Sequence, residues 1–190
     1  TVTFPATNPN ATTLGAVDVS GGTGIFASPN LVFAPDLVVA GSSATAELST
    51  GSSKSFNSIT LAGTLRGSDA IEVVGTGGSP ADFEWRSGTL GGTGTFRTAP
   101  GTLTQLSPTA AFVRMTLDRD WLSEGQIDYL ATDFREDLVI NGTLTNRGTF
   151  DIAVSSTPSI QGSGTLRNEG RIEKTTGVSI GLLSGLTYDN

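Results

Sequence analysis

The sequence predicts an all-β fold, a right-handed parallel β-helix (β-solenoid) with coils of about 22 residues. Three observations predict it. A Gly-Thr-Leu phrase recurs, with glycine or asparagine after it and a second apolar residue six positions beyond the leucine. Apolar residues alternate within a copy, as in Phe150, Ile152 and Val154, which is the period of a strand. Most copies lie 22 to 25 residues apart, whereas the hairpins of a β-sandwich would recur every ~8–12 residues.

The repeated phrase predicts columns of inward side chains, because the same place on each coil needs the same kind of residue. The first apolar residue of each copy should form one inward stack, comprising Leu65, Leu90, Trp121, Leu144 and Leu166. The second should form another, comprising Ile71, Phe96, Ile127, Phe150 and Ile172. We also expect Asn146 and Asn168 to form a short amide ladder at a corner, where asparagine tolerates a left-handed backbone.

The repeat divides the chain into two regions. Residues 1–36 do not match it and are predicted to be an N-terminal cap or a leading strand segment. Residues 37–190 form the predicted solenoid, with about six or seven coils from Gly41 onward at ~22 residues each. The interval from Leu90 to Trp121 is 31 residues, so we expect an insertion near residues 98–112.

Composition excludes several classes of function. The formal net charge is −7, and the 11 lysines and arginines are scattered among 18 acids, so no basic surface for nucleic acid is expected. No apolar stretch reaches the ~18–20 residues needed for membrane insertion. Cysteine and histidine are absent, which removes thiolate nucleophiles, the commonest general base and the commonest transition-metal ligands. No cofactor is expected, and the protein is predicted not to be an enzyme.

One acidic segment, Arg114 to Leu138, favours an alternative function in carbohydrate binding or polysaccharide processing. A glycosidase needs two carboxyl groups ~5–9.5 Å apart, which neighbouring coils could supply on the face around residues 118–137. Simple surface pairing with the arginines at 114, 119 and 135 is the other interpretation. Trp85 and Tyr129 are candidate sugar contacts, although Trp85 follows Phe83 at the period of a strand and could face the core instead.

Charged residues on the outer face are predicted to line up between coils. Glu124, Arg147 and Glu169 should form a surface ladder of alternating sign. Asp128, Asp151 and Glu173 should stack as three carboxylates, which is repulsive unless compensated. A calcium ion would compensate them, as would screening by a neighbouring cation or water, and the Gly-Gly-x-Gly-x-Asp repeat of calcium-binding β-helices is absent.

The stretches "LVINGTLTNRGTFDI" (138–152) and "GTLRNEGRIEK" (164–174) resemble the strand repeats of exported bacterial right-handed β-helix proteins. These include autotransporter passengers and filamentous-haemagglutinin-like adhesins. The resemblance covers roughly residues 37 to 174 and implies a scaffold with no shared catalytic motif. It also implies an extracellular or cell-surface location.

The C-terminal stretch stays apolar and rich in glycine almost to Asn190. Its apolar residues are the predicted end-to-end interface, because a coil needs a neighbour to bury its interior; they are Ile180, Leu182, Leu183 and Leu186. We therefore expect a structural or adhesive element of a bacterial surface. Its partner would be another copy, forming filaments, or the remainder of a longer surface protein, with a glycan as a candidate ligand.

Overall fold

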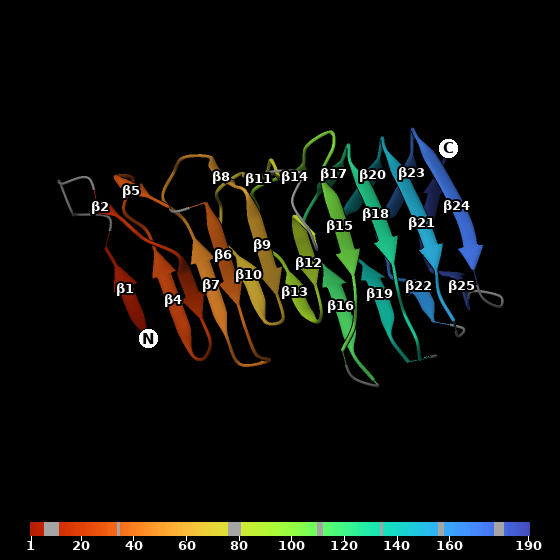
Figure 1. Ribbon diagram of the computed structural model, residues 1–190, viewed down its shortest axis with the longest axis horizontal. Coiled ribbons are helices and arrows are strands. Elements are labelled where there is room, and N and C mark those ends of the chain that lie inside the picture. Colours follow the sequence, from red (N-terminus) through yellow and green to blue (C-terminus); the bar gives the residue numbers. More distant parts are fainter. Residues whose placement is uncertain are drawn as a thin grey trace.

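The computed structural model describes residues 1–5, 12–33, 35–75, 81–109, 112–133, 135–155, 158–176 and 181–190. Within these ranges the chain is all-β and contains no helix. Figure 1 shows a rod in which the strands lie side by side along the long axis, with the two ends of the chain at opposite ends of the rod. Every strand pairing is parallel, so the predicted β-solenoid is confirmed.

The rod has three long sheets, and a two-stranded sheet precedes the seven-stranded one in its N-terminal part. The nine-stranded sheet contains β1 (Val2–Phe4), β4 (Thr23–Phe26), β7 (Thr45–Leu48), β10 (Thr64–Arg66), β13 (Gly88–Leu90), β16 (Arg114–Leu117), β19 (Asp137–Ile140), β22 (Ser159–Gln161) and β25 (Gly181–Ser184). The seven-stranded sheet contains β8 (Lys54–Phe56), β11 (Ile71–Val73), β14 (Phe96–Thr98), β17 (Trp121–Ser123), β20 (Thr143–Asn146), β23 (Thr165–Asn168) and β26 (Thr187–Asp189). The eight-stranded sheet contains β3 (Val17–Val19), β6 (Asp36–Val39), β9 (Ser58–Leu61), β12 (Phe83–Trp85), β15 (Leu103–Leu106), β18 (Gln126–Tyr129), β21 (Thr149–Ala153) and β24 (Arg171–Thr176). The two-stranded sheet contains β2 (Thr12–Thr13) and β5 (Leu31–Val32).

Each coil contributes one strand to each of three faces. Strands therefore pair with the strand three places earlier and three places later in the chain, as β19 does with β16 and β22. The same order begins within residues 1–36, where β1, β2 and β3 are followed by β4, β5 and β6. Strands β2 and β5 take the place in this order that the seven-stranded sheet takes later. The leading residues thus form strands of the solenoid.

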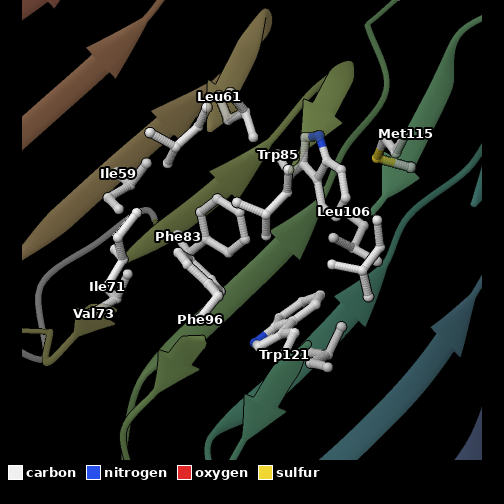
Figure 2. Close-up of a cluster of buried hydrophobic side chains, with 14 of the residues drawn as sticks. Ile59, Leu61, Ile71, Val73, Phe83, Trp85, Phe96, Leu106, Met115 and Trp121 are labelled. Carbon is white, nitrogen blue, oxygen red and sulfur yellow. The ribbon is translucent and has the colours of Figure 1, made fainter. Parts of the chain in front are cut away.

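Inward side chains from all three sheets fill the interior, because alternate residues of each strand point to opposite faces. An aromatic cluster lies at the middle of the rod, where Phe83, Trp85, Phe96 and Trp121 are all buried. Their ring centroids lie 4.9 to 6.3 Å apart, within the range of favourable aromatic pairs. Figure 2 shows these rings among aliphatic side chains from neighbouring coils.

The predicted inward residues are buried or partly buried, but the two predicted columns are wrong between Leu90 and Trp121. Leu65 pairs with Leu90, which pairs with Leu117 in the nine-stranded sheet. Trp121 instead continues Phe96, in the seven-stranded sheet.

The residues that the sequence placed in two columns therefore belong to three. In the nine-stranded sheet the column runs through Leu65, Leu90, Leu117 and Ile140. In the seven-stranded sheet it runs through Ile71, Phe96, Trp121, Leu144 and Leu166. In the eight-stranded sheet Ile127, Phe150 and Ile172 stack as predicted.

The error has a simple physical cause. A Gly-Thr-Leu phrase encodes a corner followed by an inward apolar residue, and each face of the coil needs both. The copies ending at Leu65 and Leu90 lie in the nine-stranded sheet, whereas those ending at Leu144 and Leu166 lie in the seven-stranded sheet. The Gly-Thr-Leu phrase therefore predicts that a corner is present, but it does not indicate which of the three sheets the following strand joins.

The predicted insertion near residues 98–112 contains a regular strand of the solenoid. Residues Leu103–Leu106 form β15, which pairs with β12 and β18 in the eight-stranded sheet. The additional chain lies in the connection from β15 to β16, residues 107–113, where the preceding coil needs only Arg86 and Ser87. Residues 110 and 111 of this connection lie outside the described residues.

Glycine is required at the corners because consecutive coils approach there within contact distance. A Cβ atom on Gly148 would lie 1.8 Å from the carbonyl oxygen of Gly125, and one on Gly170 would lie 2.3 Å from that of Gly148. These three residues precede β18, β21 and β24 at the same corner. No larger residue fits while the strands keep their spacing.

Candidate functional sites

The acidic segment around residues 118–137 does not form one acidic face. Its strands β16, β17, β18 and β19 belong to three different sheets, so residues close in sequence lie on different sides of the rod. The carboxylates bind the next coil: Asp118 accepts a hydrogen bond from Asn141 Nδ2 at 2.7 Å, and Asp120 accepts one from the Thr143 amide at 3.0 Å. Asp137 likewise accepts the Ser159 amide at 3.1 Å. These groups join coils together.

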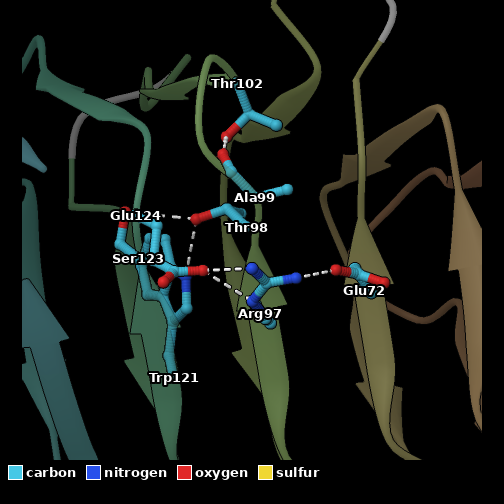
Figure 3. Close-up of polar contacts among 8 residues, drawn as sticks. All are labelled: Glu72, Arg97, Thr98, Ala99, Thr102, Trp121, Ser123 and Glu124. Carbon is cyan, nitrogen blue, oxygen red and sulfur yellow. Dashed lines mark hydrogen bonds and ion pairs between the residues drawn. The ribbon is translucent and has the colours of Figure 1, made fainter. Parts of the chain in front are cut away.

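Ion pairs between coils run along the outer face of the seven-stranded sheet. Arg97 contacts Glu72 on one neighbouring coil and Glu124 on the other, and both contacts raise the pKa of its guanidinium (Figure 3). Arg147 pairs with Glu169 at 2.7 Å, as the sequence predicted. The predicted ladder is thus divided, because Glu124 pairs with Arg97 on the preceding coil. Exposed pairs of this kind contribute little to the stability of the fold, because solvent screens the two charges.

Trp85 and Tyr129 are not sugar contacts, because both are fully buried. They occupy one inward column of the eight-stranded sheet, in which Trp85 pairs with Leu106 and Leu106 pairs with Tyr129. The indole nitrogen of Trp85 donates to the Ser87 carbonyl at 2.9 Å, which satisfies its polar group without solvent. The alternative placement of Trp85 in the core is therefore correct.

The predicted row of carboxylates exists, since Asp128 pairs with Asp151 and Asp151 with Glu173. Each has another partner. Asp128 accepts from Gln126 Nε2 at 2.7 Å, Asp151 accepts from Thr175 Oγ1 at 2.8 Å, and Glu173 pairs with Arg171. Within the described ranges, no group of three or more acidic side chains is arranged to hold a metal ion. The repulsion between the carboxylates is offset by neighbouring side chains.

The predicted asparagine ladder is present and is longer than predicted. Asn146 Nδ2 donates to Asn168 Oδ1 at 2.9 Å, and Asn168 Nδ2 donates to Asn190 Oδ1 at 2.7 Å. Asn146 is fully buried and also donates to the Arg171 carbonyl at 3.0 Å. The signal for Asn190 was its distance of 22 residues from Asn168, equal to that between the first two members.

Arg119 is not a surface residue, although the sequence suggested surface pairing. It is 3% exposed, and its guanidinium donates to the carbonyl oxygens of Gly94 at 2.7 Å and Asp69 at 2.9 Å. Burial lowers the pKa of Arg119 to about 10, and the charge of Asp69 opposes that shift. Arg119 therefore joins three coils through backbone acceptors.

A hollow that the sequence did not reveal lies where β16 and β19 begin. It has a volume of about 500 Å³ and is lined by Phe112, Arg114, Arg135 and Asp137. Phe112 is 67% exposed, and the guanidinium of Arg135 stacks on its ring with 3.7 Å between the Cζ atom and the ring centroid. The sequence could not show this hollow, because its side chains come from connections and strand ends on two successive coils.

The connection from β18 to β19, of which the structure describes residues 130–133, 135 and 136, lies on one side of this hollow and is fixed by internal hydrogen bonds. The Glu136 carboxylate is 2% exposed and accepts hydrogen bonds from the amides of Thr132 and Asp133, at 2.5 and 2.7 Å. The Tyr129 hydroxyl donates to the Glu136 carbonyl, and burial raises the pKa of Tyr129. Glu136 therefore has a structural role in shaping this connection.

Of the four predicted end-to-end interface residues, Ile180 lies outside the described residues. Leu182 and Leu183 belong to β25, and their side chains lie outside the described part of the structure. Leu186 is partly buried against the core. Strands β24, β25 and β26 are the last strands of their sheets, each with one described neighbour.

Comparisons with family models, curated proteins and solved structures found no match to this chain. Over the described residues, the structure has no helix of the length and apolar character needed to span a bilayer.

Proposed function

We propose that this chain is a non-catalytic structural or adhesive β-solenoid of a bacterial cell surface. Its coils would continue by end-to-end stacking on a second copy or on the remainder of a longer surface protein. The strands of that partner would pair in parallel with the last strand of each sheet, as the strands within the rod pair with each other.

The observation that carries the proposal is the bonding pattern of the last strands. Arg167 pairs with Asp189 at 2.9 Å, and Asn168 bonds to Asn190, in the same way that inner coils bond to each other. The last strand of each sheet has backbone groups directed away from its single described neighbour. A further coil could pair there by the same rules.

A non-catalytic role is supported by how the acidic groups are used. Asp118, Asp120 and Asp137 each accept hydrogen bonds from the following coil, and Glu136 is buried within its own connection. These carboxylates stabilise the fold through hydrogen bonds within and between coils. A scaffold of repeated coils is the kind of structure that surface proteins use to extend from a cell.

Electron microscopy and light scattering over a wide range of concentrations test self-stacking. We expect rods that lengthen with concentration. The variant to compare is Tyr188→Pro. The Thr187 amide donates to the Gly164 carbonyl, and the amides of successive strand residues point to opposite sides. The Tyr188 amide therefore points away from β23 and is available to a further strand. Proline removes this donor, and the variant should remain short. A monodisperse wild-type monomer at every concentration would contradict self-stacking.

The non-catalytic part of the proposal has its own test, a reducing-sugar assay on a panel of polysaccharides. We expect no turnover. Turnover that is lost in Asp120→Asn or Asp128→Asn would instead establish the enzyme alternative.

A further inference from the structure

We propose that the hollow formed by Phe112, Arg114, Arg135 and Asp137 binds an acidic saccharide through a uronic acid unit. Nothing in this inference depends on end-to-end stacking, so the two proposals can fail separately.

Phe112 is held in an exposed position at an energetic cost. Its ring is 67% exposed, the largest value among the large hydrophobic residues that the structure describes as exposed. Its φ is 66°, in the left-handed region that bulky residues rarely adopt, and it is the single non-glycine residue there within the described ranges. Strained backbone at an exposed aromatic ring is commonly found at binding sites, where it sets the position of a contact.

The other side of the hollow is preorganised. Arg135 stacks on Phe112 from the connection between β18 and β19, and that connection is shaped by the buried carboxylate of Glu136. The Tyr129 hydroxyl fixes the same connection from the core through the Glu136 carbonyl. A ligand would therefore meet an arrangement that is largely formed before binding, which reduces the entropy lost on association.

The charge of the hollow differs from that of the rest of the protein. The formal net charge is −7, yet two arginines lie together here. Six other arginines form ion pairs with acidic residues; they are Arg66, Arg86, Arg97, Arg147, Arg167 and Arg171. Arg114 is exposed and forms no ion pair with the residues that the structure describes. Its guanidinium is available to an anionic ligand.

The chemistry of the lining favours a sugar acid over a simple anion. The planar guanidinium of Arg114 matches a carboxylate, with which it can form two parallel hydrogen bonds. The apolar face of a pyranose ring would pack against the part of the Phe112 ring that the guanidinium of Arg135 leaves exposed. Asp137 repels the doubly charged form of phosphate more strongly than a singly charged carboxylate, and it can accept hydrogen bonds from sugar hydroxyls in addition to those it receives from Ser159 and Gln161. A uronic acid unit supplies all three complementary groups.

Isothermal titration calorimetry with a galacturonic acid trimer at low ionic strength tests the proposal, with maltotriose as the neutral probe and inorganic phosphate as the simple anion. We expect binding of the acidic trimer and much weaker binding of both other probes. Arg114→Gln and Phe112→Gly should each weaken the binding about tenfold. Glycine also relieves the positive φ at position 112, so this variant should remain folded.

Arg66→Gln is the matched control, since it makes the same change of charge on an exposed arginine of the nine-stranded sheet. It should bind the trimer as the wild type does. The proposal is overturned if the acidic trimer does not bind at millimolar concentration, or if phosphate or maltotriose binds equally well. It is also overturned if neither Arg114→Gln nor Phe112→Gly weakens binding.

Discussion

At the scale of single residues, some buried hydroxyl groups have hydrogen-bond partners and others have none. Thr98 and Thr104 are both fully buried. The Thr98 hydroxyl accepts from Trp121 Nε1 at 3.2 Å and bonds to Ser123 Oγ at 3.1 Å (Figure 3). The Thr104 hydroxyl has no hydrogen-bond partner. A buried hydroxyl without a partner costs about 1–3 kcal/mol, so the same residue type is stabilising at one site and costly at the other.

Replacement by valine should separate the two threonines. Thr104→Val keeps the shape of the side chain and removes an unpaired hydroxyl from the column between Phe83 and Ile127, so the free energy of unfolding should rise by about 1 kcal/mol. Thr98→Val should lower it by about 1–2 kcal/mol, because Trp121 and Ser123 lose a partner. Urea denaturation measures both. A loss of stability in Thr104→Val would show that this hydroxyl is hydrogen-bonded.

The burial of Tyr129 leads us to expect that the free energy of unfolding falls at alkaline pH. Burial raises its pKa in the folded state, whereas an unfolded tyrosine ionises near pH 10. Ionisation of the unfolded chain therefore favours unfolding as the pH rises above ~10, and this loss of stability is absent in Tyr129→Phe. Arg119, whose lowered pKa acts in the opposite direction, is common to both proteins and cancels.

The comparison of wild type with Tyr129→Phe gives the measurement. At pH 7 the variant should be about 1–2 kcal/mol less stable, because the Glu136 carbonyl loses its donor. The difference between the two proteins should shrink as the pH is raised from ~9 to ~11. A difference that stays constant over this range would mean that the Tyr129 hydroxyl is exposed in the folded protein.

At the scale of strands and corners, the spacing of the coils depends on a few positions without a Cβ atom. Gly148 faces the Gly125 carbonyl from the next coil, and it follows a turn from β20 and precedes β21. A side chain there would push two coils apart and break the hydrogen bond from the Thr149 amide to the Gly125 carbonyl, 3.2 Å long. Corners, more than strands, therefore limit which sequences can form this coil.

Gly148→Ala should lower the free energy of unfolding by about 2–4 kcal/mol, because the alanine Cβ atom would lie 1.8 Å from a backbone oxygen if nothing moved. Gly21→Ala is the matched control, since it has nothing within 4 Å of its Cβ position and no positive φ. Its stability should stay within about 0.5 kcal/mol of the wild type. Thermal unfolding of the two variants provides the comparison, and equal effects would contradict the close approach at Gly148.

At the scale of the whole molecule, stability should vary along the rod, because each coil contacts mainly its neighbours. The middle contains the aromatic cluster of Phe83, Trp85, Phe96 and Trp121. The last strands have little burial: β24 is mostly exposed, and β26 is exposed throughout. The chain should therefore open from its C-terminal coil while the middle stays folded.

Hydrogen exchange measured residue by residue tests this expectation. Amides of β12, β14 and β17 should be protected the most, and those of β24 and β26 should exchange at least about a hundredfold faster at neutral pH. Protection that is uniform from end to end would contradict independent opening of the last coil. Stacking of a further copy would also increase protection at β26, so the measurement should be made under conditions in which the protein is monomeric.

The sequence by itself determined the coil of about 22 residues, the inward alternation of Phe150 and Ile152, and the glycine corners, because these depend on local periodicity and local backbone geometry. The tertiary structure alone decided which sheet each Gly-Thr-Leu phrase joins and that Leu90 stacks on Leu117, since every face of a coil needs the same corner. It also decided that Tyr129 is buried and that Phe112 meets Arg135. Those facts depend on which residues of successive coils are brought side by side, and that register follows from the packing of the whole rod.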